Sequence, residues 1–286
     1  VRRRRGGGLR VWVLLAFIAY GAWYWFSNQS VDPVTGENVL IDRSLSAEDE
    51  KALGLQAYQQ ILEQERWVDP DATISREVRN IAERLIAKVE PVEAALAAEH
   101  GMEPTRFSAG FDWEVNVIDS DQANAFALPG GKMAVYTGLV PVAGNEDAMA
   151  VVMGHEIAHA VLRHGAQRMA QQRLSQIGQA AGAFSGMDPQ QQQMVMAAMG
   201  YGYLLPYARK HESEADEVGL MLAAAACFDP REAVPLWERM GQGAGGQAPP
   251  EFASTHPSSE TRIAHLQSLM PKALEFRARF CEEGPL

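Results

Sequence analysis

The sequence predicts an α+β chain that is mainly helical, with a small β-sheet in its first half and one membrane-spanning helix at its N-terminus. Three observations support this fold class. Helical patterns cover most of the chain, apolar and polar residues alternate around 113–117, and an uncharged apolar run follows a cluster of arginines. With 286 residues, 47% of them hydrophobic and 21% charged, the chain is long enough to bury a sizeable core.

The charge of the chain is unevenly distributed. Five of the 25 basic residues lie in the first ten positions, which leaves 20 basic against 36 acidic side chains and a net charge of −16 for the remainder. Such an acidic body repels phosphate backbones, so nucleic acid is excluded as a partner. The simplest interpretation of the acidity is solubility.

The N-terminal segment is typical of a signal anchor. Residues 11–26 are uncharged and apolar, end in aromatics, and are followed by no small-x-small cleavage site. The preceding arginines are expected to stay cytoplasmic, which exports the body of the protein. A cleaved signal peptide is the alternative, with the same consequence. The predicted organisation is a basic tail at 1–10, a transmembrane anchor at 11–27, a linker at 28–44 and one globular domain at 45–286.

Within that domain, turn and capping residues divide the pattern into elements. Lys132–Thr137 follows a Pro-Gly-Gly turn and is interpreted as an exposed edge strand because it begins with a lysine. Pro91 is expected to interrupt a helix. The other predicted elements are helices at 46–66, 75–89 and on to 101, a strand around 113–117, helical structure from 145 to about 240, a flexible break at 241–250, and a last helix at 259–280.

Two cysteines, Cys227 and Cys281, lack the close spacing of a zinc knuckle or a redox pair. They are interpreted either as two small buried hydrophobic residues or as a disulfide that pins the C-terminus. The second interpretation requires an oxidising compartment.

The strongest functional signal is the sequence HEIAH at 155–159, in a helix that Asn145 is suited to cap. His155 and His159 are four residues apart, so both imidazoles project from one helix face and can bind one Zn²⁺. Glu156 is placed to take a proton from the attacking water. A pair of surface histidines is the alternative, but the flanking residues are apolar, and a buried helix does not carry such side chains unsatisfied.

A third zinc ligand is expected from the acidic stretch HESEADEVGL at 211–220. Spacing alone leaves Glu212 and Glu214 both open as the ligand. Asp216 lies one turn after Glu212, where it could accept a hydrogen bond from a zinc-bound histidine. Taken alone, the stretch could equally be a solvated acidic face.

These motifs resemble the zinc peptidases related to the CAAX prenyl protease, in particular their exported bacterial BepA-like branch. The resemblance runs from about Asp32 to Leu269. It is carried by four segments in the family's order: NAFALPGGKMAVYTGL at 124–139, HEIAH at 155–159, ARKHESEADEVGL at 208–220 and THPSSETR at 255–262.

The resemblance implies a zincin-like metallopeptidase domain with one Zn²⁺ per chain. It makes Glu212 the third ligand and gives Asp216 the supporting role. It adds His256 and Arg262 to Glu156 as catalytic residues, with His256 either stabilising the reacting carbonyl or binding the zinc and closing the site. It also implies that 124–137 contains the edge strand on which a substrate peptide lies, and that 183–207 can cover the cleft. His164 fits the family pattern and is interpreted as structural.

The implied function is that of a membrane-anchored zinc endopeptidase acting on misfolded or stalled envelope proteins in protein quality control. The implied location is the bacterial inner membrane, single-pass, with the catalytic domain on the periplasmic side. One alternative is a zinc-containing chaperone or adaptor with a mostly latent site. Two others are a protease that cuts within the bilayer and a different metal-dependent hydrolase.

Overall fold

The computed structural model describes residues 7–185, 189–200, 204–242, 256 and 260–281. The backbone forms two compact units. One comprises the described residues within 1–32, 37–46 and 164–210, and the other comprises the described residues within 33–36, 47–163 and 211–286.

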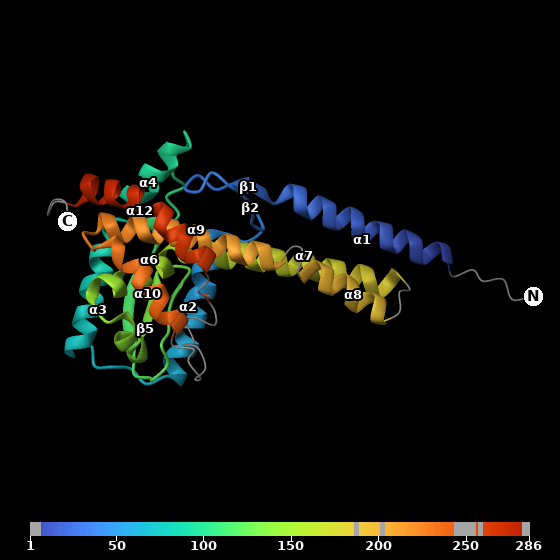
Figure 1. Cartoon of the computed structure of the whole chain (residues 1–286). Coiled ribbons are helices and arrows are strands. Elements are labelled where there is room, and N and C mark those ends of the chain that lie inside the picture. Colours follow the sequence, from blue (N-terminus) through green and yellow to red (C-terminus); the bar gives the residue numbers. More distant parts are fainter. Residues whose placement is uncertain (1–6, 186–188, 201–203, 243–255, 257–259, 282–286) are drawn as a thin grey trace, which may run out of the picture. The chain divides into compact units, whose positions relative to one another are not determined.

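The first unit is built on two long helices, α1 (Gly7–Ser27) and α7 (His164–Ser185), which lie side by side (Figure 1). A short antiparallel ribbon of β1 (Gln29–Val31) and β2 (Asn38–Leu40) follows α1, and α8 (Pro189–Met199) follows α7. Tyr24 is buried in a small cluster with Leu40 and Ala170, and its hydroxyl donates to Asp42 Oδ2 at 3.0 Å.

The apolar run at 11–26 is helical, as predicted, and forms most of α1. Among the residues described, however, none of the helices combines the length and apolar character that a membrane crossing requires. The predicted transmembrane helix is therefore not found. The arginines at 2–5 lie outside the described residues.

The second unit contains a three-stranded sheet in the order β3-β5-β4. β3 (Glu114–Ile118) pairs in parallel with β5 (Lys132–Tyr136), and β4 (Ala125–Leu128) pairs antiparallel to β5. The interpretation of the 132–137 strand as an exposed edge is wrong: β5 is the central strand and all five of its residues are buried. Its lysine is accommodated because Lys132 Nζ lies 2.9 Å from Asp112 Oδ2 and 3.3 Å from Glu114 Oε2. β3 and β4 form the two edges of this sheet.

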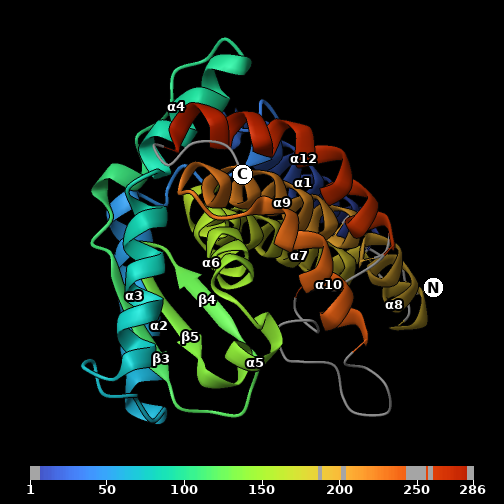
Figure 2. The same ribbon diagram turned by 60° about the vertical axis from the view of Figure 1, so that its left-hand side comes forward.

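Helices cover both faces of this sheet (Figure 2). Side chains of α3 (Thr73–Ile86) and α6 (Glu146–Val161) join Val117 and Val135 in the main hydrophobic core. α2 (Ala47–Gln64) contributes Ile61 to the opposite face. Because alternate residues of a strand point to opposite faces, each strand supplies both layers.

The first helices follow the sequence prediction, with one correction. The break expected at Pro91 lies earlier, at residues 87–88, and α4 (Val89–Glu99) begins just before that proline. Pro91 is tolerated there because the first turn of a helix has N–H groups without intrahelical partners.

The predicted helical region at 145–240 is interrupted several times. α6 ends before Arg163, whose φ of 57° turns the chain, and α9 (Leu205–Ala225) ends before Cys227, whose φ is 69°. Other described elements include the 3-10 helices η1 (Ser108–Gly110), η2 (Thr137–Leu139) and η4 (Pro230–Glu232), a short α5 (Val140–Ala143), α10 (Ala233–Gln242) and α12 (Glu260–Phe280). Most of the break predicted at 241–250 lies outside the described residues.

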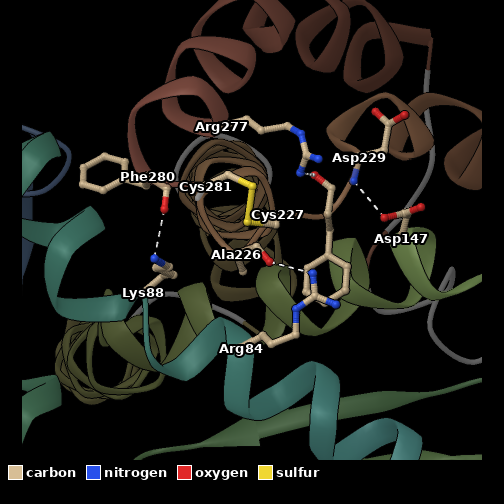
Figure 3. Close-up of a disulfide and its surroundings, with 10 residues drawn as sticks. Arg84, Lys88, Asp147, Ala226, Cys227, Asp229, Arg277, Phe280 and Cys281 are labelled. Atoms are coloured by element: carbon tan, nitrogen blue, oxygen red, sulfur yellow. Dashed lines mark hydrogen bonds between the residues drawn. A yellow bond between two sulfur atoms is a disulfide. The ribbon is translucent and has the colours of Figure 1, made fainter. Parts of the chain in front are cut away.

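Cys227 and Cys281 form a disulfide with a Cα–Cα distance of 5.0 Å (Figure 3). It joins the turn after α9 to the end of α12. Two neighbouring hydrogen bonds reinforce the junction: Lys88 Nζ donates to the carbonyl of Phe280 at 2.9 Å, and Arg84 donates to the carbonyl of Ala226 at 2.9 Å. Of the two interpretations of the cysteines, the bridge pinning the C-terminal segment is the one observed.

Candidate metal centre

Two histidines of α6 provide the base of the site. Asn145 caps this helix, its side chain accepting from the backbone N–H of Ala148 at 2.8 Å, and every residue from 148 to 161 is buried. His155 and His159 lie one turn apart, and their Nε2 atoms are 3.0 Å from each other. At this distance one ring can donate its N–H to the other, and the two nitrogens are also close enough to bind one metal ion together.

α9 brings the acidic segment to these histidines. Glu212 Oε2 lies 3.4 Å from His155 Nε2, and Glu212 Oε1 lies 3.5 Å from His159 Nε2. Spacing in the sequence left Glu212 and Glu214 both open as the third ligand. In the structure Glu212, and not Glu214, belongs to the cluster formed with His155 and His159.

The geometry of these donors fits a zinc ion. A tetrahedral zinc with bonds of about 2.0–2.1 Å separates its ligand atoms by about 3.4 Å. The observed separations of 3.0, 3.4 and 3.5 Å lie close to that value. Two imidazoles and one carboxylate are also the ligands found in catalytic zinc sites. His155, His159 and Glu212 are therefore the residues that could hold the metal.

Asp216 lies behind the first histidine. Its Oδ1 is 3.0 Å from His155 Nδ1, which leaves Nε2 of the ring for a metal. Burial lowers the pKa of His155, but its hydrogen bonds with Asp216 and Glu212 outweigh burial and raise that pKa to about 9. Burial raises the pKa of Asp216, and the charge of Arg262 together with the contact to His155 outweighs it, so the carboxyl pKa is held below its usual range.

Glu156 lies beside the cluster without being a member of it. The backbone N–H of Ala127, on the edge strand β4, donates to its carboxylate, and its Oε1 is 3.5 Å from His256 Nε2. Burial raises the pKa of Glu156. A carboxylate with a raised pKa is suited to exchange protons near neutral pH.

The late loop residues also reach the centre. His256 Nδ1 lies 2.7 Å from Glu212 Oε2 and 3.2 Å from His155 Nε2, so His256 is a fourth member of the donor cluster. Arg262, in the first turn of α12, donates to Asp216 Oδ1 at 2.6 Å and to Glu212 Oε2 at 3.3 Å. The rest of the predicted loop motif, 255 and 257–259, lies outside the described residues.

The structure thus brings all seven predicted site residues together: His155, Glu156, His159, Glu212, Asp216, His256 and Arg262. Two further residues at the site had not been predicted. Ala127 contacts Glu156 through its backbone, and Trp237 of α10 lies against Arg262, whose Cζ is 3.4 Å from the indole ring centroid. Ala127 falls within the stretch 124–137 that was expected to contain the substrate edge strand, although no role had been given to the residue itself. Trp237 has no sequence signal, since a tryptophan in a helix is an ordinary core residue. His164 is buried at the start of α7.

The α+β fold and this donor cluster define a metallopeptidase, of the class in which two histidines of an HExxH helix and a later glutamate surround the metal. Residues 83–270 match the model of peptidase family M48, and the chain belongs to this family. It is a metalloendopeptidase by that membership and by the names of its relatives.

Among curated relatives, the mitochondrial metalloendopeptidase OMA1 of Schizosaccharomyces pombe is 36% identical over 267 residues, which cover 92% of this chain and 72% of that protein. The mitochondrial OMA1 metalloendopeptidase of Homo sapiens is 31% identical, over 92% of this chain and 50% of its own length. The beta-barrel assembly-enhancing protease of Escherichia coli is 31% identical over 52% of this chain and 32% of its own length.

These matches correct the predicted location. A bacterial inner-membrane protein with a periplasmic domain is contradicted, because relatives matched over 92% of the chain, among them the two OMA1 proteins above, are mitochondrial by name. The physical reason for the error is that arginines beside an apolar run indicate orientation relative to a membrane and do not say which membrane. The matches also do not confirm the assignment to the BepA-like branch.

Proposed function

We propose that the chain hydrolyses internal peptide bonds with one zinc ion held by His155, His159 and Glu212. The observation that carries this proposal is the convergence of their donor atoms, all within 4.8 Å of one another, beside the unliganded carboxylate of Glu156. When bound, zinc would lower the pKa of a water molecule toward 7 and polarise the scissile carbonyl.

Glu156 is the proposed general base and acid. Its carboxylate accepts the proton of the attacking water and then delivers that proton to the leaving amine. The Ala127 N–H donates to this carboxylate and orients it. Its raised pKa brings proton uptake and release closer to neutral pH, which both halves of this role require.

Arg262 and His256 are the proposed stabilisers of the charge that develops on the carbonyl oxygen. Both side chains border the donor cluster, and both contact Glu212 Oε2. Asp216 has a supporting role, because its contact with Nδ1 sets the orientation and tautomer of His155.

The edge strand β4 is the proposed docking site of an extended substrate. The N–H of Tyr136 donates to the carbonyl of Asn124 at 3.0 Å, so Asn124 faces β5. In an antiparallel pair, every second residue of a strand forms hydrogen bonds with its partner strand. The N–H and C=O groups of Ala125 and Ala127 therefore point away from β5. The Ala127 N–H at Glu156 agrees with this alternation, and it places the outer edge of β4 next to the proposed base. The Ala125 N–H on the same edge donates to Asn124 Oδ1 at 2.9 Å.

The test is the variant Glu156→Gln beside Glu146→Gln, which changes an exposed glutamate of the same helix. Zinc content and cleavage of casein are measured in both. Zinc in both variants and cleavage only by Glu146→Gln is the expected result. Cleavage by Glu156→Gln would contradict the proposed mechanism.

A zinc-containing chaperone or adaptor with a latent site is the second candidate. It is favoured by one observation: His256 lies within the donor cluster, where a fourth protein ligand would close the site. The presence of Glu156 favours the hydrolase, since a closed structural site has no use for a general base. Action on misfolded or stalled polypeptides, and a lid formed by 183–207, stay predictions; residues 186–188 and 201–203 of that segment lie outside the described residues.

Contact of α1 with a lipid surface is also proposed. Large apolar side chains of this helix are exposed, among them Trp12 at 72%, Trp23 at 60% and Phe26 at 76%. Aromatic side chains of this kind favour a membrane interface. Co-sedimentation with phosphatidylcholine vesicles is expected for the full chain and not for a variant with all three changed to Ser; equal sedimentation of both would contradict the proposal.

A further inference from the structure

Trp237 lies at the back of the metal centre. It belongs to α10 and is 1% exposed. The Arg262 guanidinium covers one region of its indole, with Cζ 3.4 Å from the ring centroid. The His155 ring meets the same indole in an edge-on arrangement, with centroids 6.0 Å apart. Neither the HExxH pattern nor the acidic motif includes this residue.

The contact with Arg262 matters because that arginine joins two residues of the centre. Its two terminal nitrogens donate to Asp216 and to Glu212. A guanidinium is planar, so it can serve two carboxylates only in a narrow range of orientations. An aromatic face beneath the guanidinium restricts its tilt, and the attraction between cation and ring is greatest where water is excluded.

We propose that Trp237 is a positioning residue of the zinc centre. The indole face holds the planar Arg262 guanidinium in a fixed orientation. In that orientation the arginine can donate at once to the Glu212 ligand and to the Asp216 carboxylate, which contacts His155. Trp237 also fills the space beside His155 and so keeps water from that ring. This inference rests on the zinc binding of the proposed function and extends it to a residue outside the ligand set.

The same unit offers a matched control. Phe228 is also 1% exposed, and the guanidinium of Arg84 lies 3.8 Å from its ring centroid. Arg84, however, donates to Glu146 and to the carbonyl of Ala226, neither of which belongs to the donor cluster. Phe228→Leu therefore removes a buried aromatic–arginine contact without changing the surroundings of the proposed ligands.

The test measures zinc affinity by competition with a chromophoric chelator, together with thermal unfolding. Trp237→Leu is expected to weaken zinc binding about 10–100-fold, the usual effect of losing a residue that orients ligands. Trp237→Phe, which keeps an aromatic face, is expected to restore most of that affinity. Phe228→Leu is expected to unfold at a lower temperature with unchanged zinc affinity. Equal affinity in Trp237→Leu and the unmutated chain, or an equal loss in Phe228→Leu, would overturn the proposal.

A second measurement covers the case in which Trp237→Leu does not fold. The unmutated chain, with its six tryptophans replaced by 5-fluorotryptophan, is titrated with zinc and followed by ¹⁹F NMR. The resonance missing from Trp237→Phe identifies Trp237, and it is expected to shift as zinc binds. A Trp237 resonance that stays in place while zinc binds would overturn the inference. An unmutated chain that binds no zinc would overturn both proposals, whereas one that binds zinc without cleaving casein would contradict only the hydrolysis.

Discussion

Gly154 of α6 and Gly219 of α9 lie back to back where the two helices cross. A Cβ on Gly154 would be 2.7 Å from the carbonyl oxygen of Gly219, and a Cβ on Gly219 would be 2.6 Å from the backbone nitrogen of His155. The two helix backbones can come this close only because neither residue carries a side chain. The contact lies directly beside His155, so it determines how closely α9 can bring its carboxylates to the histidines of α6.

Gly219→Ala is expected to push the two helices apart. Such overpacking typically costs about 1–3 kcal/mol of unfolding free energy, and zinc affinity should fall as well because Glu212 moves with α9. Gly182→Ala is the control: it lies in helix α7, where a Cβ meets only a side-chain atom at 3.9 Å. That variant should be neutral or stabilised by up to about 1 kcal/mol. Urea unfolding measures the stability of both variants, and zinc titration measures their affinity for the metal. Normal zinc affinity in Gly219→Ala would contradict the argument.

Glu212→Ala is expected to lose most of its bound zinc, because the carboxylate is the third member of the proposed ligand set. Glu214→Ala, two residues away on the same helix, is expected to retain zinc at one ion per chain. Metal content after gel filtration distinguishes the two. Full zinc occupancy in Glu212→Ala would remove it from the ligand set.

His256→Ala separates the two roles proposed for that residue. If His256 stabilises the reacting carbonyl, casein cleavage should fall by about 10²-fold or more. If its position beside Glu212 closes the site instead, cleavage should rise. The hydrolase proposal expects the fall, measured at saturating zinc so that metal loss is not mistaken for either effect.

Zinc uptake should depend on pH through His155. Its pKa of about 9 in the metal-free protein means that the ring carries a proton below that pH, and the metal must displace this proton. Apparent zinc affinity is therefore expected to rise up to about tenfold per pH unit between pH 7 and 9. Calorimetric titration in buffers of different ionisation enthalpy would count the released protons. Affinity that is constant over this range would contradict the prediction.

The same pKa has a consequence for the stability of the metal-free protein. Because the folded-state pKa of His155 lies above its ordinary value of 6.5, the stabilisation from this group is complete below about pH 6.5. It is lost as pH rises toward 9. Urea midpoints of the metal-free chain should accordingly decrease over this interval, and an increase would show that another group dominates.

The Cys227–Cys281 disulfide should contribute strongly to stability. It closes a loop with a sequence separation of 54 residues, for which the chain-entropy estimate is about 4 kcal/mol. Reduction with dithiothreitol is expected to lower the unfolding free energy by that order. The double variant Cys227→Ser/Cys281→Ser should resemble the reduced chain and be indifferent to the reductant. If the urea midpoint of the unmutated chain is the same before and after reduction, the estimate is refuted.

Some predictions from the sequence were wrong because residues nearby in the fold changed what a single residue usually indicates. Lys132 suggested an edge strand, yet β5 is central, and Asp112 and Glu114 neutralise the lysine there. Pro91 suggested a break, yet it occupies a first helical turn, where its missing N–H costs little. In both cases the residue's usual preference was real, and its surroundings removed the penalty.

The sequence by itself determined the parts of the site that depend on local periodicity. His155 and His159 share a face because they are four residues apart on one helix, and Glu156 stands beside them for the same reason. Only the tertiary structure decided what joins them. Glu212, rather than Glu214, lies in the donor cluster with the α6 histidines because of how α6 and α9 cross, and Trp237 reaches Arg262 through the packing of α10. Such contacts between distant segments depend on the packing of whole helices, which spacing within one segment does not specify.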